Sequence, residues 1–157
     1  MAAAGIRPGD LVLDIGAGTG ALTVPLVAAG ARVIAFELHP RRAQLLRDRF
    51  AGSSVTVVQV DAADLRLPRR PFRVVANPPF GITTAILRRL LSRGSRLETA
   101  DLVVPRHVAF RWASGRGAGA NGWSAVFDAR LVAELPRSAF RPRPPGDAAV
   151  LRLERRA

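Results

Sequence analysis

The sequence of 157 residues predicts an α/β fold with a seven-stranded, mostly parallel sheet and an antiparallel final strand. Three observations support this prediction. Short apolar runs alternate with amphipathic stretches along the chain. A glycine-rich turn follows the first apolar run, as where a buried strand leads into a helix. No stretch is long enough to be a linker between two domains, so we expect a single domain over residues 1–157.

Seven apolar runs are expected to form the strands. They are Leu11–Ile15, Arg32–Glu37, Val55–Val60, Phe72–Ala76, Ala100–Val104, Trp123–Leu135 and Ala148–Leu153. The last two are expected to pair with each other in antiparallel fashion. The connector between them, Arg137–Gly146, is rich in proline and arginine, which favours an extended conformation.

Amphipathic stretches between the strands are expected to form helices. They are Thr19–Ala29, Pro40–Phe50, Thr83–Arg93 and Arg106–Ser114. Pro25 lies inside the first of them, where it should remove one backbone hydrogen bond and cause a kink. Pro40 opens the second, where its fixed φ suits the first turn. A glycine-rich loop, Gly115–Gly122, is expected after the last helix.

Charge is the strongest feature of the composition. The chain has 24 basic residues, all of them arginine, against 12 acidic ones, which gives a net charge of +12. The use of arginine without lysine indicates the codon preference of a GC-rich genome. That preference does not explain why bases outnumber acids two to one. The excess favours a polyanionic partner, with nucleic acid as the first hypothesis.

Composition also excludes several classes of site. Without cysteine the chain has no disulfide framework, thiolate zinc site or cysteine nucleophile. Two histidines are too few for a histidine-rich metal site, so no metal is expected. Met1–Asp10 has no secretion signal, and the uncharged run Ile15–Ala31 contains several glycines and is short for a bilayer span. We therefore expect a soluble, cytoplasmic protein.

The first predicted strand leads into a glycine-rich turn with Gly16, Gly18 and Gly20. Glycines let the backbone approach a ligand, and the start of the following helix offers free N–H groups. Glu37 ends the second strand 17 residues after Gly20, where a carboxylate can accept both hydroxyls of a ribose. Turn and acid together indicate a cofactor that contains adenosine.

Two further acids bear on which cofactor this is. Gly16, Gly18 and Ala21 also fit the dinucleotide pattern GxGxxG/A, so a nicotinamide oxidoreductase is an alternative. Asp14, just before the glycines, would repel a pyrophosphate but suits a cationic amino or sulfonium group. Asp61 ends the third strand at the same sheet edge, where it can accept a hydrogen bond from the adenine amino group; a helix cap is the alternative.

Asn77-Pro78-Pro79-Phe80 follows the fourth strand at this edge. The prolines stiffen the backbone and remove two N–H donors, so the carbonyl groups stay available as acceptors. The Asn77 side-chain oxygen and the Pro78 carbonyl can receive both protons of a planar amino group, and Phe80 can stack on its ring. A stiffened turn with a core phenylalanine is the alternative.

Together these motifs resemble the S-adenosylmethionine-dependent adenine-N6 methyltransferases of the rRNA dimethylase superfamily. Gly81-Ile82-Thr83-Thr84 and Phe140-Arg141-Pro142-Arg143-Pro144 look more like the erythromycin-resistance (Erm) methyltransferases than the small-subunit dimethylases. The resemblance implies a Rossmann-like methyltransferase fold, S-adenosyl-L-methionine as cofactor, and mono- or dimethylation of an adenine in 23S rRNA of the kind that gives antibiotic resistance. It assigns cofactor binding to Asp14, Gly16, Gly18, Gly20, Glu37, Asp61, Ala62 and Asn77, and catalysis to Asn77, Pro78 and Phe80.

The sequence also departs from this family. Members carry a segment ahead of the first strand and a small helical C-terminal domain for RNA binding, whereas here Met1–Asp10 precedes the strand and the chain stops at Ala157. Pro145-Gly146-Asp147 stands where the family often has Val-Asp. The resemblance thus implies a short member. Alternatives are a small-subunit dimethylase, a DNA adenine or protein glutamine methyltransferase, and a non-catalytic cofactor- or RNA-binding module.

Arginines at the rim of the catalytic edge are expected to contact RNA phosphates. They are Arg106, Arg111, Arg116, Arg137, Arg141 and Arg143. The expected partner is ribosomal RNA, naked or in precursor particles, bound by a monomer. A solvated surface with arginines favoured by codon usage is the alternative for each residue.

Overall fold

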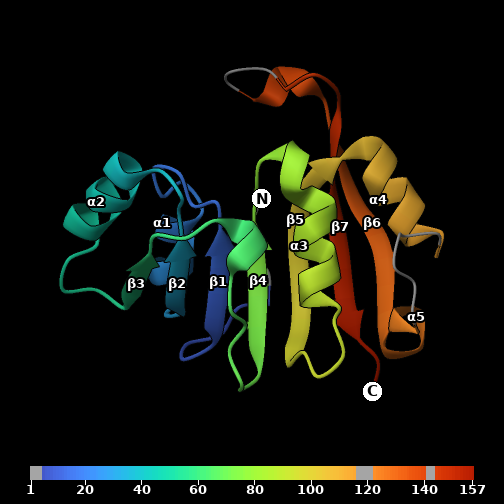
Figure 1. Cartoon of the computed structure of the whole chain (residues 1–157), viewed down its shortest axis with the longest axis horizontal. Helices are drawn as coiled ribbons and strands as arrows, with labels where there is room; N and C mark the ends of the chain where they lie inside the picture. The colour runs from blue at the N-terminus through green and yellow to red at the C-terminus, as the bar shows by residue number, and fades with distance from the viewer. Residues whose placement is uncertain (1–4, 116–121, 141–143) are drawn as a thin grey trace.

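Seven strands form one sheet in the computed structural model, which describes residues 5–115, 122–140 and 144–157 (Figure 1). The strand order is β3-β2-β1-β4-β5-β7-β6. The strands are β1 (Leu11–Ile15), β2 (Arg32–Phe36), β3 (Val55–Val58), β4 (Phe72–Ala76), β5 (Leu97–Pro105), β6 (Phe127–Leu135) and β7 (Ala148–Arg155). The pairs among β1 to β5 are parallel, whereas β7 is antiparallel to both β5 and β6. The prediction of a mostly parallel seven-stranded sheet with an antiparallel final strand is confirmed.

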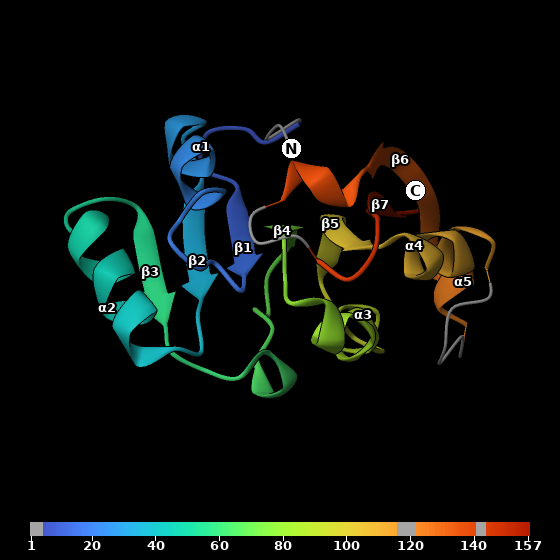
Figure 2. The same ribbon diagram turned by 90° about the horizontal axis from the view of Figure 1, so that it is seen from above.

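Helices cover both faces of the sheet. The chain forms α1 (Thr23–Ala28), α2 (Pro40–Arg49), α3 (Thr83–Leu90), α4 (Arg106–Ala113) and α5 (Trp123–Val126). Figure 2 shows α1 and α3 on opposite sides. In β1, Leu13 packs into the apolar cluster under α3, and its neighbour Val12 packs into the cluster under α1. Burial on both faces explains why the central strands read as unbroken apolar runs.

The first helix is shorter than predicted. It begins at Thr23 instead of Thr19, and Gly20, with a φ of 95°, lies in the turn that precedes it. Pro25 is therefore the third helical residue. The N–H groups of Val24 and Leu26 donate to the carbonyls of Gly20 and Leu22, so Pro25 leaves out the hydrogen bond that would lie between these two. The kink expected at Pro25 stays a prediction.

The start of the sixth predicted strand is also wrong. Trp123–Val126 forms the short helix α5, and β6 begins only at Phe127. Gly122 turns the chain with a φ of 80°. Trp123 is buried beside Trp112 of α4, with ring centroids 5.2 Å apart. Packing between these rings, which local β propensity does not register, sets the conformation of this segment.

The described start of the connector between β6 and β7 lies near the carboxyl ends of the parallel strands (Figures 1 and 2). It was predicted to be extended, but Arg137–Ala139 forms the 3₁₀ helix η3. Phe140 then packs with Phe80 against an apolar cluster of β5 and β7. Within the described residues, no helix has the length and apolar character needed to cross a membrane.

Candidate active site

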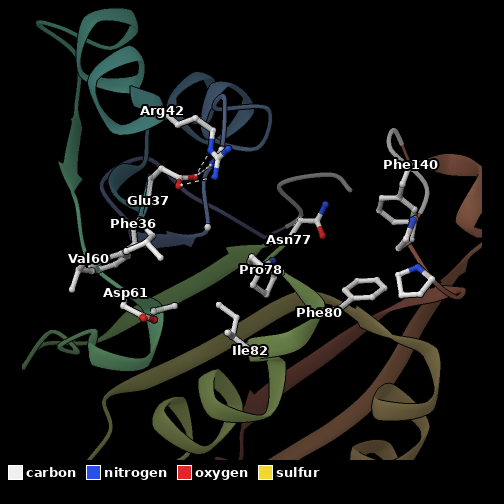
Figure 3. Close-up of a pocket in the computed structure, with 17 residues that line it drawn as sticks. Phe36, Glu37, Arg42, Val60, Asp61, Asn77, Pro78, Phe80, Ile82 and Phe140 are labelled. Carbon is white, nitrogen blue, oxygen red and sulfur yellow. Dashed lines mark hydrogen bonds and ion pairs between the residues drawn. The ribbon is translucent and has the colours of Figure 1, made fainter. Parts of the chain in front are cut away.

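A cavity of about 830 Å³ opens at the carboxyl ends of β1, β2 and β4 (Figure 3). Ligands of open parallel sheets bind at this edge, and the volume suits a small molecule. Eight of the residues predicted for the site line the cavity: Gly16, Gly18, Glu37, Asp61, Ala62, Asn77, Pro78 and Phe80. Four segments that are distant in sequence are thus brought together.

The three glycines after β1 have different neighbours. A Cβ on Gly16 would lie 3.1 Å from Cδ of Pro79, so Gly16 lets the two turns touch. A Cβ on Gly18 would meet nothing within 4 Å, and Gly18 faces the cavity. A Cβ on Gly20 would lie 2.8 Å from the ring of Phe50 beyond α2. Gly20 does not line the cavity; its position serves packing.

Glu37 is held in place from three directions. It is 5% exposed, and its Oε1 accepts a hydrogen bond from the N–H of Gly18 at 2.9 Å. Its Oε2 accepts from the N–H of His39 at 2.8 Å, and the Arg42 guanidinium lies 3.4 Å from the carboxylate. Burial alone would raise the pKa of Glu37, but these donors outweigh it and lower the pKa. The carboxylate therefore stays charged at neutral pH.

Asp14 lies beneath the glycine turn and does not line the cavity. It is 1% exposed, and its Oδ2 accepts a hydrogen bond from the Thr23 hydroxyl at 2.8 Å. Its Oδ1 is buried without a partner in the described part of the chain. Burial raises the pKa of Asp14 to about 6, with a smaller contribution from the charge on Glu37. Its contact with a cofactor stays a prediction.

Asp61 lies on the opposite wall of the cavity from Arg42 (Figure 3). Its Oδ1 accepts a hydrogen bond from the N–H of Ala63 at 3.0 Å and so caps the 3₁₀ helix η1 (Ala62–Asp64). Its other oxygen has no partner within the described residues. The sequence offered two roles for Asp61, a helix cap and an acceptor for the adenine amino group. These roles are compatible, because one oxygen caps the helix and the other is available to a ligand.

Asn77 follows β4 directly and lies between the Glu37 side of the cavity and the ring of Phe80 (Figure 3). Its side chain is exposed and makes no hydrogen bond within the described residues. The backbone below it is fixed by β4, which pairs with β1 and β5, and by buried Pro78. Both hydrogen-bonding functions of the amide are therefore free for a ligand.

A second cavity, of about 940 Å³, adjoins the first and shares Phe80 and Pro145 with it. Arg106, His107 and Phe110 of α4 line it. The Arg106 guanidinium forms an ion pair with Glu134 and lies 5.1 Å from the centre of the exposed Phe110 ring. This cavity places an aromatic ring and basic groups next to the Asn77 turn.

The other predicted RNA-binding arginines are less closely grouped. Arg111 and Arg137 are exposed and line neither cavity. Arg116, Arg141 and Arg143 lie outside the described residues.

Sequence reasoning missed several side chains of the first cavity, among them Arg42 and Phe140. The sequence contains many arginines, and nothing in its pattern singled out Arg42. Its position in the first turn of the helix that follows Glu37 could have indicated a contact with that carboxylate. Phe140 was assigned to an RNA-binding connector, and its ring lines the cavity beyond Phe80 (Figure 3). Phe140 reaches the cavity because it lies in the connection between β6 and β7. The path of that connection cannot be derived from the local sequence.

Comparison with known proteins identifies the family. The family model described as ribosomal RNA adenine dimethylase matches residues 1–157. The chain belongs to the ribosomal RNA adenine dimethylases. S-Adenosyl-L-methionine is the cofactor of this family, and the cavity fits it: Glu37 suits the ribose, the free oxygen of Asp61 suits the adenine amino group, and Gly18 leaves space for the ligand.

Relatives named for antibiotic resistance and relatives named as small-subunit methyltransferases are both similar to this dimethylase-family chain. Mycinamicin-resistance protein MyrB of Micromonospora griseorubida is 41% identical over 93% of the chain and 47% of its own length. The rRNA adenine N-6-methyltransferase of Corynebacterium diphtheriae is 38% identical over 92% and 57%. Ribosomal RNA small subunit methyltransferase A of Leifsonia xyli is 36% identical over 98% and 59%. The chain thus spans about half the length of these relatives.

Among solved structures, the 23S rRNA methyltransferase ErmE superposes with a TM-score of 0.86 at 34% identity, over 98% of this chain and 64% of that one. A dimethyladenosine transferase from Plasmodium falciparum superposes with a TM-score of 0.83 at 27% identity, over 98% and 58%. The methyltransferase fold expected from the motifs is therefore confirmed.

Proposed function

We propose that this chain transfers methyl groups from S-adenosyl-L-methionine to N6 of an adenine in 23S rRNA. The observation that carries the proposal is the division of one cavity into two halves. Glu37 and Asp61 offer carboxylate oxygens on one side, while Asn77 and Phe80 offer an amide and a ring on the other. A cofactor and a flipped base can then meet in the middle.

The first half suits an adenosine group. Glu37 is charged and already oriented by three donors, and its oxygens retain acceptor capacity for ribose hydroxyls. Asp61 is positioned by its bond to Ala63. Val60 and Ile82 supply apolar surface beside it for the purine ring. S-Adenosyl-L-methionine supplies an electrophilic methyl group when it is bound.

The second half suits the adenine that receives the methyl group. The Asn77 side-chain oxygen and the Pro78 carbonyl accept hydrogen bonds from the two N–H groups of the adenine amino group, and this turns the nitrogen lone pair out of conjugation with the ring. Phe80 stacks on the base. Orientation supplies most of the acceleration, since the methyl group is already reactive. As the bond from the nitrogen to the methyl carbon forms, the bond from that carbon to the sulfonium sulfur breaks and its electron pair stays on sulfur. The nitrogen then loses one proton to solvent.

Motif details favour the large-subunit substrate over the small-subunit one. Gly81-Ile82-Thr83-Thr84 follows the catalytic turn as in the erythromycin-resistance methyltransferases. The adjoining cavity, with Phe110, Arg106 and His107, is placed to receive nucleotides that flank the target adenine. A ring for stacking and basic groups for phosphates are the features that single-stranded RNA requires.

Transfer of labelled methyl groups to naked 23S rRNA, compared with 16S rRNA and small-subunit particles, tests the proposal. We expect label in 23S rRNA as N6-methyladenine. Asn77→Ala should lower turnover by about 100-fold or more, because it removes one of the two acceptors that orient the amino group. Binding of the cofactor, measured by calorimetry, should change less than about threefold.

Gln44→Ala is the matched control, because Gln44 also carries an amide but lies on the exposed face of α2, bonded to Asp48. Its turnover should equal that of the wild type. Full activity in Asn77→Ala would contradict the role of the turn. Label found only in small-subunit RNA would replace the substrate with that of the dimethylases.

A further inference from the structure

A third cavity, of about 500 Å³, lies beyond the end of α3, where the turn Leu91–Arg96 meets α5. In Figure 1, α3 runs from the Asn77 edge of the sheet toward the opposite edge, and α5 lies near that opposite edge. None of the residues that line this cavity lines the two cavities described above. It is therefore a separate site, to which the proposed methyl transfer assigns no role.

The side chains that line this cavity carry positive charges and no negative ones. The lining contains Arg93, Arg96 and Arg155 and no carboxylate. Arg93 and Arg96 are exposed, and their guanidinium groups form no hydrogen bond or ion pair with the side chains or backbone of other described residues. Three guanidinium groups around one hollow repel one another unless an anion lies between them.

Neighbouring residues hold one of these arginines in place. The Nε of Arg155 donates to the carbonyl of Leu97 at 2.8 Å, and its Nη2 donates to that of Ser95 at 2.7 Å. Its guanidinium also lies 4.7 Å from the centre of the Phe127 ring. Two of its five N–H groups are used in this way, and the remainder are available to a ligand.

Trp123 closes one side of the cavity. It is 5% exposed, and its Nε1 is buried, so it is the ring rather than the N–H group that the cavity presents. The cavity thus has several donors and positive charges, but no ionised acceptor among its lining side chains.

We propose that this cavity binds a phosphate group of the RNA strand whose adenine occupies the Asn77 cavity. The proposal rests on the proposed function for the identity of the strand. The eight residues of α3 span about 12 Å, so one RNA strand that follows this helix can reach from the catalytic turn to Arg93. The cavity serves as a second anchor that fixes the direction of the strand.

Binding of a labelled 23S rRNA fragment as a function of salt tests the proposal. The double variant Arg93→Gln, Arg96→Gln should weaken binding about tenfold and reduce the slope of log K against log salt by about 0.7, as expected for one lost phosphate contact on a single strand. The matched control, Arg47→Gln, Arg130→Gln, removes equal charge from exposed arginines of α2 and β6 that have no partners in the described structure. Its slope should change by less than half as much.

Two further measurements separate the possible outcomes. Equal slopes for the double variant and its control would overturn the proposal. Tight binding of inorganic phosphate, measured by calorimetry, with RNA binding unaffected by the variants would also overturn it, since the site would then serve a free anion. Loss of RNA binding specific to the double variant in a protein that transfers no methyl group would keep the phosphate site and remove the proposed function.

Discussion

Glycine has three different tasks within the five residues after β1, and only one of them concerns the ligand. All three positions have positive φ, of 75°, 58° and 95° for Gly16, Gly18 and Gly20. Gly18 leaves space at the cavity, whereas Gly16 lets the catalytic turn approach and Gly20 accommodates Phe50. A sequence pattern records that glycine is present but does not reveal which of these contacts requires it.

Gly16→Ala, compared with a control variant, should distinguish the effect of a steric contact with Pro79 from the cost of placing alanine at a positive φ. Its Cβ would lie 3.1 Å from Cδ of Pro79 and would push the catalytic turn away, so we expect turnover to fall about tenfold or more. Gly52→Ala is the control, because its φ of 76° matches but its Cβ would meet nothing within 4 Å. Both variants should lose about 1 to 2 kcal/mol of unfolding free energy through φ alone. Equal turnover in the two variants would contradict the contact.

Asp14 makes stability depend on pH in an unusual direction. Its pKa is about 6 in the folded chain, against 3.8 for the free side chain. The folded state therefore holds the proton more tightly, and the stability gained from the neutral acid is present below pH 4 and lost as pH rises through 6. The difference amounts to about 3 kcal/mol.

Asp14→Asn should abolish this contribution. We expect the unfolding free energy of the variant, relative to wild type, to rise by about 3 kcal/mol between pH 4 and pH 7, because the amide has no proton to lose. Urea denaturation at several pH values measures it. The cost of burying the amide is the same at every pH, so it does not affect how the difference in unfolding free energy between variant and wild type changes with pH. If that difference does not change between pH 4 and pH 7, the pKa of Asp14 is not raised in the folded chain.

At the scale of elements, the insertion of β7 between β5 and β6 builds the right-hand part of the sheet in Figure 1. Asp101 of β5 and Arg152 of β7 are register partners and form a two-point ion pair at 2.7 and 3.1 Å. Asp101 is 6% exposed. This pair places opposite charges where the two strands must match, so it favours the observed register over a shifted one.

Arg152→Leu should cost about 2 kcal/mol of unfolding free energy, because it leaves the Asp101 carboxylate buried without its partner. The double variant Asp101→Leu, Arg152→Leu should recover more than half of that loss. Arg32→Leu, on an exposed arginine of β2 without an ion pair among the described residues, should change stability by less than about 0.5 kcal/mol. A double variant as unstable as the single one would show that the pair contributes net stability.

Elements were predictable where a single local rule decides them. Phe72–Ala76 has the predicted bounds because a run this short, rich in valine and bounded by polar turns, favours a buried strand over a helix. The ends of α1 and β6 were not predictable. The late start of α1 follows the turn around Gly20, which packs on Phe50, and α5 replaces strand at Trp123 because Trp112 lies beside it.

At the scale of the whole molecule, the charge of +12 is spread over structural and surface roles. Arg152 pairs with Asp101, Arg155 binds two carbonyl groups, and Arg106 pairs with Glu134. Arg93 and Arg96 have no such partners in the described structure. Net charge alone indicates a polyanion, while only the partners of each arginine distinguish those that hold the fold from those free to bind.

The sequence by itself determined the order of the seven strands and of helices α1 to α4 along the chain, and it pointed to the glycine turn, Glu37, Asp61 and the Asn77 turn as lining one site. These depend on periodicity and on residue types that act over a few positions. Only the tertiary structure decided that Asp14 lies beneath the cavity, that Phe140 lines it, and that a basic cavity lies beyond α3. The physical reason is that burial and enclosure depend on side chains from segments far apart in sequence, which meet only when the sheet has formed.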